Sequence, residues 1–100
     1  MNMQQMLIQA QKMQREMQKA QDELAKKEFQ VSKNGIVTVT MLGNKVITSI
    51  QISESGMDKD DKEFLEMAIK DAINECIAQI EEANEAIQSK VTRGIGMPGF

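Results

Sequence analysis

The stretch FQVSKNGIVTVTMLGNKVITSIQI, residues 29–52, decides the fold, because apolar and polar side chains alternate along it in three short runs. Alternation with a period of two is the pattern of a half-buried β-strand. The first run ends at Asn34-Gly35, a pair favoured in hairpin turns because both residues tolerate positive φ. The second run ends at a turn around Gly43. Three strands joined by tight turns predict an antiparallel meander.

The second strand is expected from Ile36 to Met41 and the third from Lys45 to Ile52. One face of each should be apolar, and the other should carry polar residues such as Thr38. The apolar face is expected to hold Val37, Val39, Met41, Val46, Ile50 and Ile52. A three-stranded sheet with one apolar face needs a second layer to cover it.

Before the sheet, apolar residues recur at alternating intervals of three and four. They are Met3, Met6, Ala10, Met13, Met17, Ala20 and Leu24. This spacing is a heptad a/d seam, and it predicts one amphipathic helix over residues 3–26. At ~1.5 Å per residue the helix is about 35 Å long. Its seam needs a partner surface, which we expect from dimerisation through the seam or from the C-terminal helix of a second subunit.

After the sheet, residues 60–92 form a C-terminal helical region. Asp60 and Glu63 have the spacing of a capping box at its start. The region is either one helix or two helices with a bend at Asn84. It can cover the sheet, because helically spaced apolar residues run along it: Leu65, Ile69, Ala72, Ile73, Cys76, Ile77, Ile80, Ala83 and Ile87.

The predicted organisation is therefore one α+β domain over residues 1–92. It consists of a helical arm over 3–26, a sheet over 28–53 and a C-terminal helical region over 60–92. Residues 93–100 contain three glycines and one proline. That composition predicts a flexible tail.

The composition argues against an enzyme. The chain has no His and one Cys, which removes His/Cys zinc sites and the Ser-His-Asp and Cys-His nucleophile systems. We expect no cofactor, no metal and no small-molecule substrate. Cys76 lies on the apolar stripe of the C-terminal region, where a free cysteine is usually a small core residue. Only three aromatic residues are present, so base stacking has little to work with.

The charge is distributed unevenly along the chain. Residues 1–33 carry six cations against four carboxylates, whereas residues 54–100 carry five cations against eleven. In the heptad numbering of the first helix, Lys12, Lys19 and Lys26 take position c and Arg15 takes position f. Both positions face away from the a/d seam. These four residues, named here the basic ridge, are the candidate DNA-binding residues, although an ordinary solvated helix face is an equally simple interpretation.

No apolar run approaches the ~18 residues that a membrane span needs. Residues 1–10 lack the basic start of a signal peptide. A single cysteine is typical of a reducing compartment. We therefore expect a cytoplasmic protein without a membrane partner.

Several segments, in order along the chain, resemble the YbaB/EbfC family of bacterial nucleoid-associated proteins. The first is KMQREMQKAQDEL, residues 12–24. It is followed by VTVTMLG (37–43), VITSIQI (46–52), DKEFLE (61–66) and the ending GMPGF (96–100). The resemblance covers nearly the whole chain.

This resemblance implies a small, tweezer-like homodimer that binds double-stranded DNA with low or modest sequence preference and lies in the nucleoid. By resemblance, the helical arms contact DNA, which assigns that role to Lys12, Arg15 and Lys19. The order of helix, hairpin strands and helix also describes a prefoldin-like protein-interaction or chaperone module. Prefoldin arms need no third strand, whereas residues 45–52 indicate one.

Overall fold

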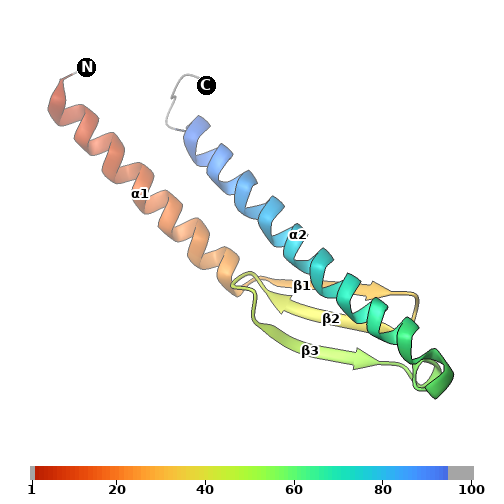
Figure 1. Cartoon of the computed structure of the whole chain (residues 1–100). Coiled ribbons are helices and arrows are strands. Elements are labelled where there is room, and N and C mark those ends of the chain that lie inside the picture. Colours follow the sequence, from red (N-terminus) through yellow and green to blue (C-terminus); the bar gives the residue numbers. More distant parts are fainter. Residues whose placement is uncertain (1, 95–100) are drawn as a thin grey trace.

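The computed structural model describes residues 2–94, with side chains as far as Val91. Helix α1 (Met3–Lys26) leads into strands β1 (Glu28–Lys33), β2 (Val37–Leu42) and β3 (Ile47–Ile52), and helix α2 (Lys62–Gly94) follows after two short 3-10 turns, Glu54–Gly56 and Lys59–Asp61 (Figure 1). The strands form an antiparallel sheet in the order β1-β2-β3. The predicted α+β fold is confirmed. Of the predicted tail, Arg93 and Gly94 end α2, and residues 95–100 lie outside the described part.

Both turns contain residues with positive φ, which Asn34 and Gly35 of the first turn adopt readily. Asn34 and Gly35 have φ of 56° and 69°, and the N–H of Ile36 donates to the carbonyl of Lys33 at 3.1 Å. Ile36 therefore belongs to the turn, and β2 begins one residue later than expected. In the second turn Lys45 has a φ of 70° and its N–H donates to the carbonyl of Leu42 at 2.8 Å. Lys45 therefore belongs to the second turn, and β3 begins at Ile47 rather than at Lys45.

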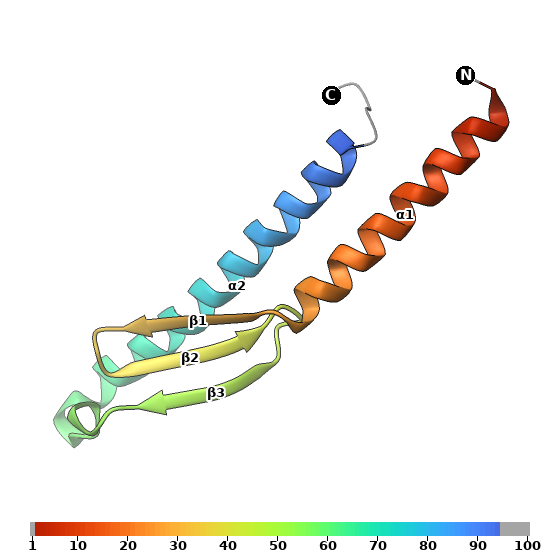
Figure 2. The same ribbon diagram turned by 180° about the vertical axis from the view of Figure 1, so that it is seen from behind.

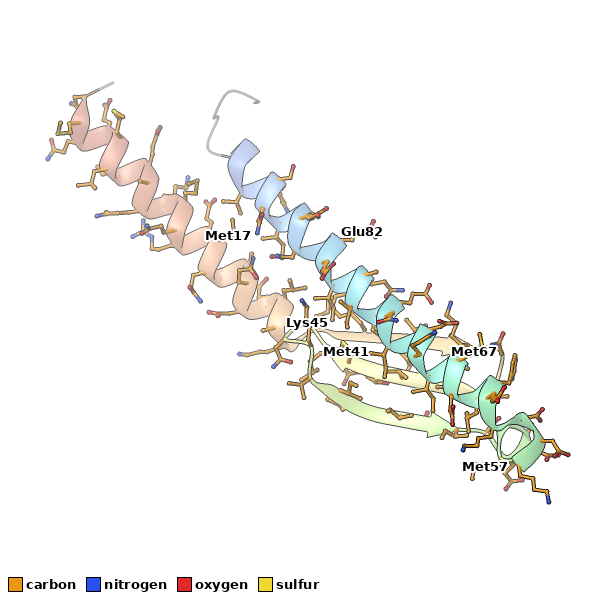
Figure 3. All side chains as sticks on the ribbon, viewed as in Figure 1. Met17, Met41, Lys45, Met57, Met67 and Glu82 are labelled. Carbon is orange, nitrogen blue, oxygen red and sulfur yellow. The ribbon has the colours of Figure 1, made fainter. Side chains whose placement is uncertain are left out.

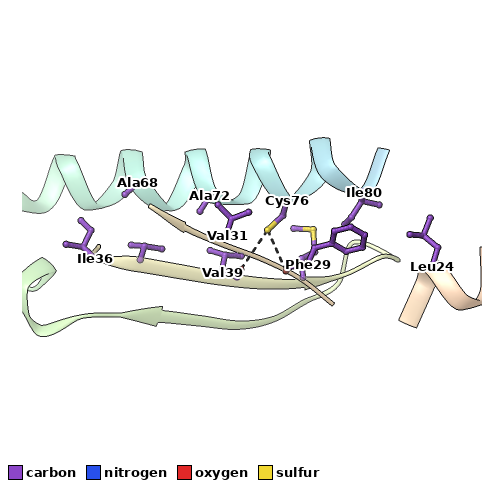
Figure 4. Close-up of a cluster of buried hydrophobic side chains, with 11 residues drawn as sticks. Leu24, Phe29, Val31, Ile36, Val39, Ala68, Ala72, Cys76 and Ile80 are labelled. Atoms are coloured by element: carbon purple, nitrogen blue, oxygen red, sulfur yellow. Dashed lines mark hydrogen bonds between the residues drawn. The ribbon is translucent and has the colours of Figure 1, made fainter. Parts of the chain in front are cut away.

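The core lies between α2 and the first two strands (Figure 4). Val31 on β1 is paired with Val39 on β2, and both are buried. Ala68 and Ala72 of α2 are buried as well, and residues four apart lie on one face of a helix. Small side chains allow the helix to approach the sheet closely. Helix α2 is therefore the second layer that covers the apolar face of the sheet.

A β-bulge changes the apolar face of β3. Thr40 pairs with Ser49 and Met41 pairs with Ile47, so Thr48 has no partner residue on β2. A bulge of one residue reverses which side chains point to each face. Ile47, not Val46, therefore joins Ile50 and Ile52 on the face that β3 shares with Met41, which corrects the expectation for Val46.

Helix α2 covers β1 and β2 but leaves β3 at the edge of the sheet, farthest from the helix (Figure 2). Ile47, Ile50 and Ile52 are 40%, 44% and 39% exposed. Glu75 on one flank of α2 binds Lys33 at the end of β1, so the other flank lies on the β3 side. Half-buried apolar side chains follow that second flank. Together they form what we call the α2–β3 face: Ile47, Ile50, Ile52, Leu65, Ile69 and Ile73.

Helix α2 is continuous from Lys62 to Gly94, which decides between the two alternatives for this region. The helix is not interrupted at Asn84, because the side-chain oxygen of Asn84 accepts a hydrogen bond from Gln21 on α1 rather than bonding its own backbone. The start of α2 differs from expectation. Asp58, not Asp60, is the capping side chain: it accepts from the N–H of Asp60 and opens a 3-10 turn that precedes the helix.

The second half of α1 packs along the second half of α2 in the same chain. Met13, Met17 and Ala20 of the seam are half-buried, and Leu24 is buried. The C-terminal helix of the same chain thus supplies a partner surface that the sequence led us to expect from a second subunit. Residues 2–12 are exposed throughout, and α1 extends beyond the end of α2 (Figure 1).

The single chain is far more extended than a compact domain. Its radius of gyration is 19.6 Å and its principal extents are 69 × 24 × 14 Å. A compact domain of this length has a radius of gyration of about 13 Å. The projecting helices account for the difference.

Candidate nucleic-acid interface

The four residues of the basic ridge are all exposed on α1. They lie opposite the seam that packs on α2, because Met13, Met17 and Leu24 take the a and d positions and the ridge takes c and f. From Lys12 to Lys26 the ridge extends over ~21 Å of helix. The structure therefore brings the predicted residues together on one outward face of the arm.

Gly43 fixes the angle at which α1 leaves the sheet. Its N–H donates to the carbonyl of Lys27 at 2.9 Å. A Cβ at this position would lie 1.8 Å from the carbonyl oxygen of Leu24, so the turn between β2 and β3 contacts the backbone at the end of α1. With Leu24 buried beside it, this close contact positions the base of the ridge.

Asp22 lies on the same outward face of α1 as the basic ridge, and its carboxylate is hydrogen-bonded within the helix. Asp22 accepts a hydrogen bond at 2.9 Å from the side-chain amide of Gln18, one turn earlier. Arg15, Lys19 and Lys26 border a shallow surface depression that is also lined by Asp22 and Glu23. The depression is open to solvent, and a helix face of this kind can lie along an extended anion.

The ridge cations differ from three lysines that are paired with carboxylates. Within residues 2–91, none of the four forms an ion pair, and they share this with Lys27, Lys59, Lys70 and Lys90. By contrast, Lys33 pairs with Glu75, and this hydrogen bond raises the pKa of Lys33. Two further lysines are also paired with carboxylates of α2, Lys45 with Glu81 at 3.7 Å and Lys62 with Glu66 at 3.8 Å. The charge of the ridge therefore remains available to an outside partner.

Two cations that sequence reasoning missed lie beside α1. Lys27 is exposed, with its ammonium 5.4 Å from the centre of the Phe29 ring. Lys90 of α2 lines the same groove between α1 and α2 as Lys27. The 3–4 spacing of the seam makes the next apolar residue due at position 27, and the lysine found there was a signal for the first of these cations. The second depends on how the two helices pack, which heptad spacing in α1 does not specify.

Cys76 has the environment of a core residue. It is buried, and its sulfur lies 3.9 Å from the carbonyl oxygen of Phe29 and 3.8 Å from that of Val39. Burial raises the pKa of the thiol, with a smaller contribution from Glu75. A buried, protonated thiol is a poor nucleophile. In the part of the chain that the structure describes, no three Cys, Asp or Glu side chains gather closely enough to hold a metal ion.

Neither helix, over the residues that are described, has an apolar stretch long enough to cross a membrane.

Comparison with known proteins gives one consistent result. The sequence profile of the YbaB/EbfC DNA-binding family matches residues 1–95. A nucleoid-associated protein of Agathobacter rectalis is 45% identical over 96 residues, which are 95% of this chain and 85% of that protein. One from Enterococcus faecalis is 41% identical over 100 residues, 99% of this chain and 94% of that protein. The crystal structure of an uncharacterized protein from Helicobacter pylori has the same fold, with a TM-score of 0.74 and 21% identity, and covers 90% of this chain and 96% of that one.

Proposed function

The chain belongs to the YbaB/EbfC DNA-binding family, and on that premise we propose that it binds double-stranded DNA as a homodimer through the basic ridge of α1. The proposed binding has low or modest sequence preference and takes place at the bacterial nucleoid. The role is binding rather than catalysis, and it needs no cofactor.

One observation carries the proposal: the four cations that share the outward face of α1 are exposed and form no ion pair within the described residues. Elsewhere Lys33, Lys45 and Lys62 are paired with carboxylates of α2. Since the chain as a whole has a net charge of −3, attraction to DNA must come from a local surface. The basic ridge is the surface that can supply it.

The geometry of the ridge favours phosphate contacts over base reading. Duplex DNA carries one charge per ~1.7 Å of its axis, so a ridge of ~21 Å lies beside about a dozen phosphate charges. Lysine and arginine contacts to phosphates position a protein on DNA without specifying sequence. This is the physical basis for the low sequence preference in the proposal.

The α2–β3 face supports the homodimer. It leaves three isoleucines of β3 about two-fifths exposed beside the half-buried Leu65, Ile69 and Ile73 of α2. Apolar surface of this kind is typical of a site that a partner covers. A second copy offers the same face, and an isologous contact across a two-fold axis would cover both. The extended shape of the single chain fits the same proposal.

The DNA-binding proposal is tested by fluorescence anisotropy on labelled duplexes of unrelated sequence over a range of salt concentrations. A dimer presents eight ridge cations. If half of them contact phosphates, the slope of log affinity against log salt is near −4, from about −0.9 for each phosphate. We expect similar affinities on all duplexes. Failure to bind any duplex at low salt would contradict the proposal.

The dimer is tested by light scattering, which should give twice the 11.2 kDa of one chain. Ile50→Glu puts a carboxylate in the α2–β3 face, whereas the control Gln51→Glu puts the same charge on the opposite face of β3. We expect the first to weaken the dimer about a hundredfold, because burying an unpaired charge costs several kcal/mol and each factor of ten is about 1.4 kcal/mol. Gln51→Glu should remain a dimer. Equal masses for the two variants would place the interface elsewhere.

A further inference from the structure

Residues 2–11 of the chain carry no charged side chain, and their exposed apolar side chains form what we call the apolar tip. Met3, Met6 and Leu7 are 85%, 58% and 59% exposed. Side chains surround this half of α1, which extends beyond the end of α2 (Figure 3). Within residues 2–94, therefore, nothing of the same chain covers the tip. None of its side chains is a cation that could hold a phosphate.

The tip continues the apolar seam of α1 whose second half packs against α2. Met3, Met6 and Ala10 occupy the same a/d seam as Ala20 and Leu24, which line the groove between α1 and α2. The first half of the seam has the same spacing but no helix beside it. It is thus suited to pack against a surface like the one that the second half contacts.

A groove of about 600 Å³ lies between α1 and α2. Its floor is apolar and rich in small side chains, formed by Ala20, Leu24, Ala83, Ala86, Ile87 and Val91. Its rim carries two glutamates, Glu16 and Glu23, and two lysines, Lys27 and Lys90, so the rim has no net charge. Small floor residues leave room for larger side chains from a second helix. The rim offers no net attraction to phosphates, whereas the depression at the basic ridge has three cations against two carboxylates, so DNA is disfavoured as the occupant of the groove.

The tip cannot reach the groove of its own chain. Leu7 and Ala20 belong to one continuous helix, and the thirteen residue steps from one to the other correspond to ~20 Å. Contact between the two surfaces therefore requires two copies of the chain.

We propose that the apolar tip of α1 (Met3, Met6 and Leu7) of one copy docks in the groove between α1 and α2 of another copy. The uncharged tip meets an apolar floor with a neutral rim, so docking buries apolar surface without removing an unpaired charge from water. The contact uses residues separate from the α2–β3 face. It adds an association between arms to the proposed dimer, and it does not require DNA.

The test places a diazirine-bearing lysine analogue at Lys90 in the full chain, in an equal mixture of ¹⁵N-labelled and unlabelled protein without DNA. After irradiation, mass spectrometry should find adducts to the N-terminal tryptic peptide ending at Lys12, joining labelled to unlabelled chains. The matched control carries the same analogue at Lys19 on the basic ridge, which lies within about 6 Å of the level of Lys90 along the arm, because Gln21 of α1 contacts Asn84 of α2. We expect few adducts to that peptide from the control.

Two variants test the docking surface. Leu7→Glu should lower the adduct yield at least about tenfold, which corresponds to about 1.4 kcal/mol, less than the cost of burying an unpaired carboxylate. Gln5→Glu puts the same charge about 160° away around the helix and should leave the yield unchanged. Adducts from Lys90 to residues 95–100 of the same chain would show that the tail occupies the groove, which would overturn the proposal. An unchanged adduct yield in Leu7→Glu would also overturn it. Because DNA is absent, neither result bears on the proposed DNA binding.

Discussion

The sheet end and the arm of this molecule are built on different principles. At the sheet end, α2 from Lys62 to Ile80 packs small side chains on β1 and β2, and most of the buried residues lie there. In the arm, formed by α1 and by α2 from Glu81 onward, burial is limited to Leu24 and Val91 among the described side chains. Carboxylates of α2 neutralise lysines in and beside the sheet, whereas the cations of the basic ridge remain unpaired. We infer that the sheet end supplies stability and the arm supplies contacts.

Replacing methionine by alanine in each region should give the largest difference in stability. Met41 is 1% exposed between β1, β3 and α2, whereas Met6 is 58% exposed at the tip of α1. We expect Met41→Ala to lower the free energy of unfolding by about 2–5 kcal/mol, from lost burial and the cavity left behind. Met6→Ala should change it by less than about 0.5 kcal/mol. Urea denaturation measures both, and equal losses would contradict the division between the regions.

Gly43 joins the two regions and should show a smaller effect of a different kind. A Cβ at this position would meet the carbonyl oxygen of Leu24, so the base of α1 must move. We expect Gly43→Ala to cost about 1–3 kcal/mol, as overpacked sites do. It should also weaken DNA binding, because the basic ridge changes its angle to the sheet. Gly35→Ala is the control for turn strain, since its Cβ would meet no atom within 4 Å although its φ is 69°. It should lower stability without weakening DNA binding.

Cys76 should show the smallest change, confined to stability. Replacing it by alanine removes a buried sulfur from the core and should cost about 0.5–2 kcal/mol. Affinity for DNA should be unaffected, because the thiol lies at the sheet end. In the folded wild type, the thiol should react slowly with iodoacetamide, since burial raises its pKa and limits access. Loss of DNA binding by a folded Cys76→Ala dimer would show that the thiol has a role in the arm.

The regular elements could be predicted from the sequence because each rests on a local pattern. The seam from Met3 to Leu24 indicated α1, and helix α1 spans Met3–Lys26. Asn34-Gly35 indicated the first turn, and both residues have positive φ. Details that depend on pairing were missed. Because of the bulge, Ile47 rather than Val46 lies on the apolar face of β3. The bulge arises from the register between β2 and β3, and the alternation within a single strand does not contain that information.

The sequence predicted only those features of the candidate site that depend on α1 alone. Heptad positions placed Lys12, Lys19 and Lys26 on one outward face, and the structure has them there. The groove containing Lys90 was not foreseen, because it forms where two helices far apart in sequence pack together. The hydrogen bond from Gln21 to Asn84 was likewise not foreseen: the sequence suggested a possible bend at Asn84, whereas this residue connects α2 to α1. Heptad positions also give no information about which cations are paired, because the carboxylates come from α2.

The central claim, that the unpaired ridge of α1 holds DNA, is tested most directly by comparing two triple variants with the wild type in salt titrations. One variant changes Lys12, Arg15 and Lys19 to glutamine, and the other changes Lys59, Lys62 and Lys70 to glutamine. Both lose the same charge, so the comparison separates the ridge from net charge.

Circular dichroism and light scattering first establish that both variants are folded dimers. We expect the ridge variant to bind all duplexes more weakly and its slope to fall from near −4 to about −1, because six of eight ridge cations are lost from the dimer. The control variant should keep a slope near that of the wild type. Unchanged affinity and slope in the ridge variant would contradict the account.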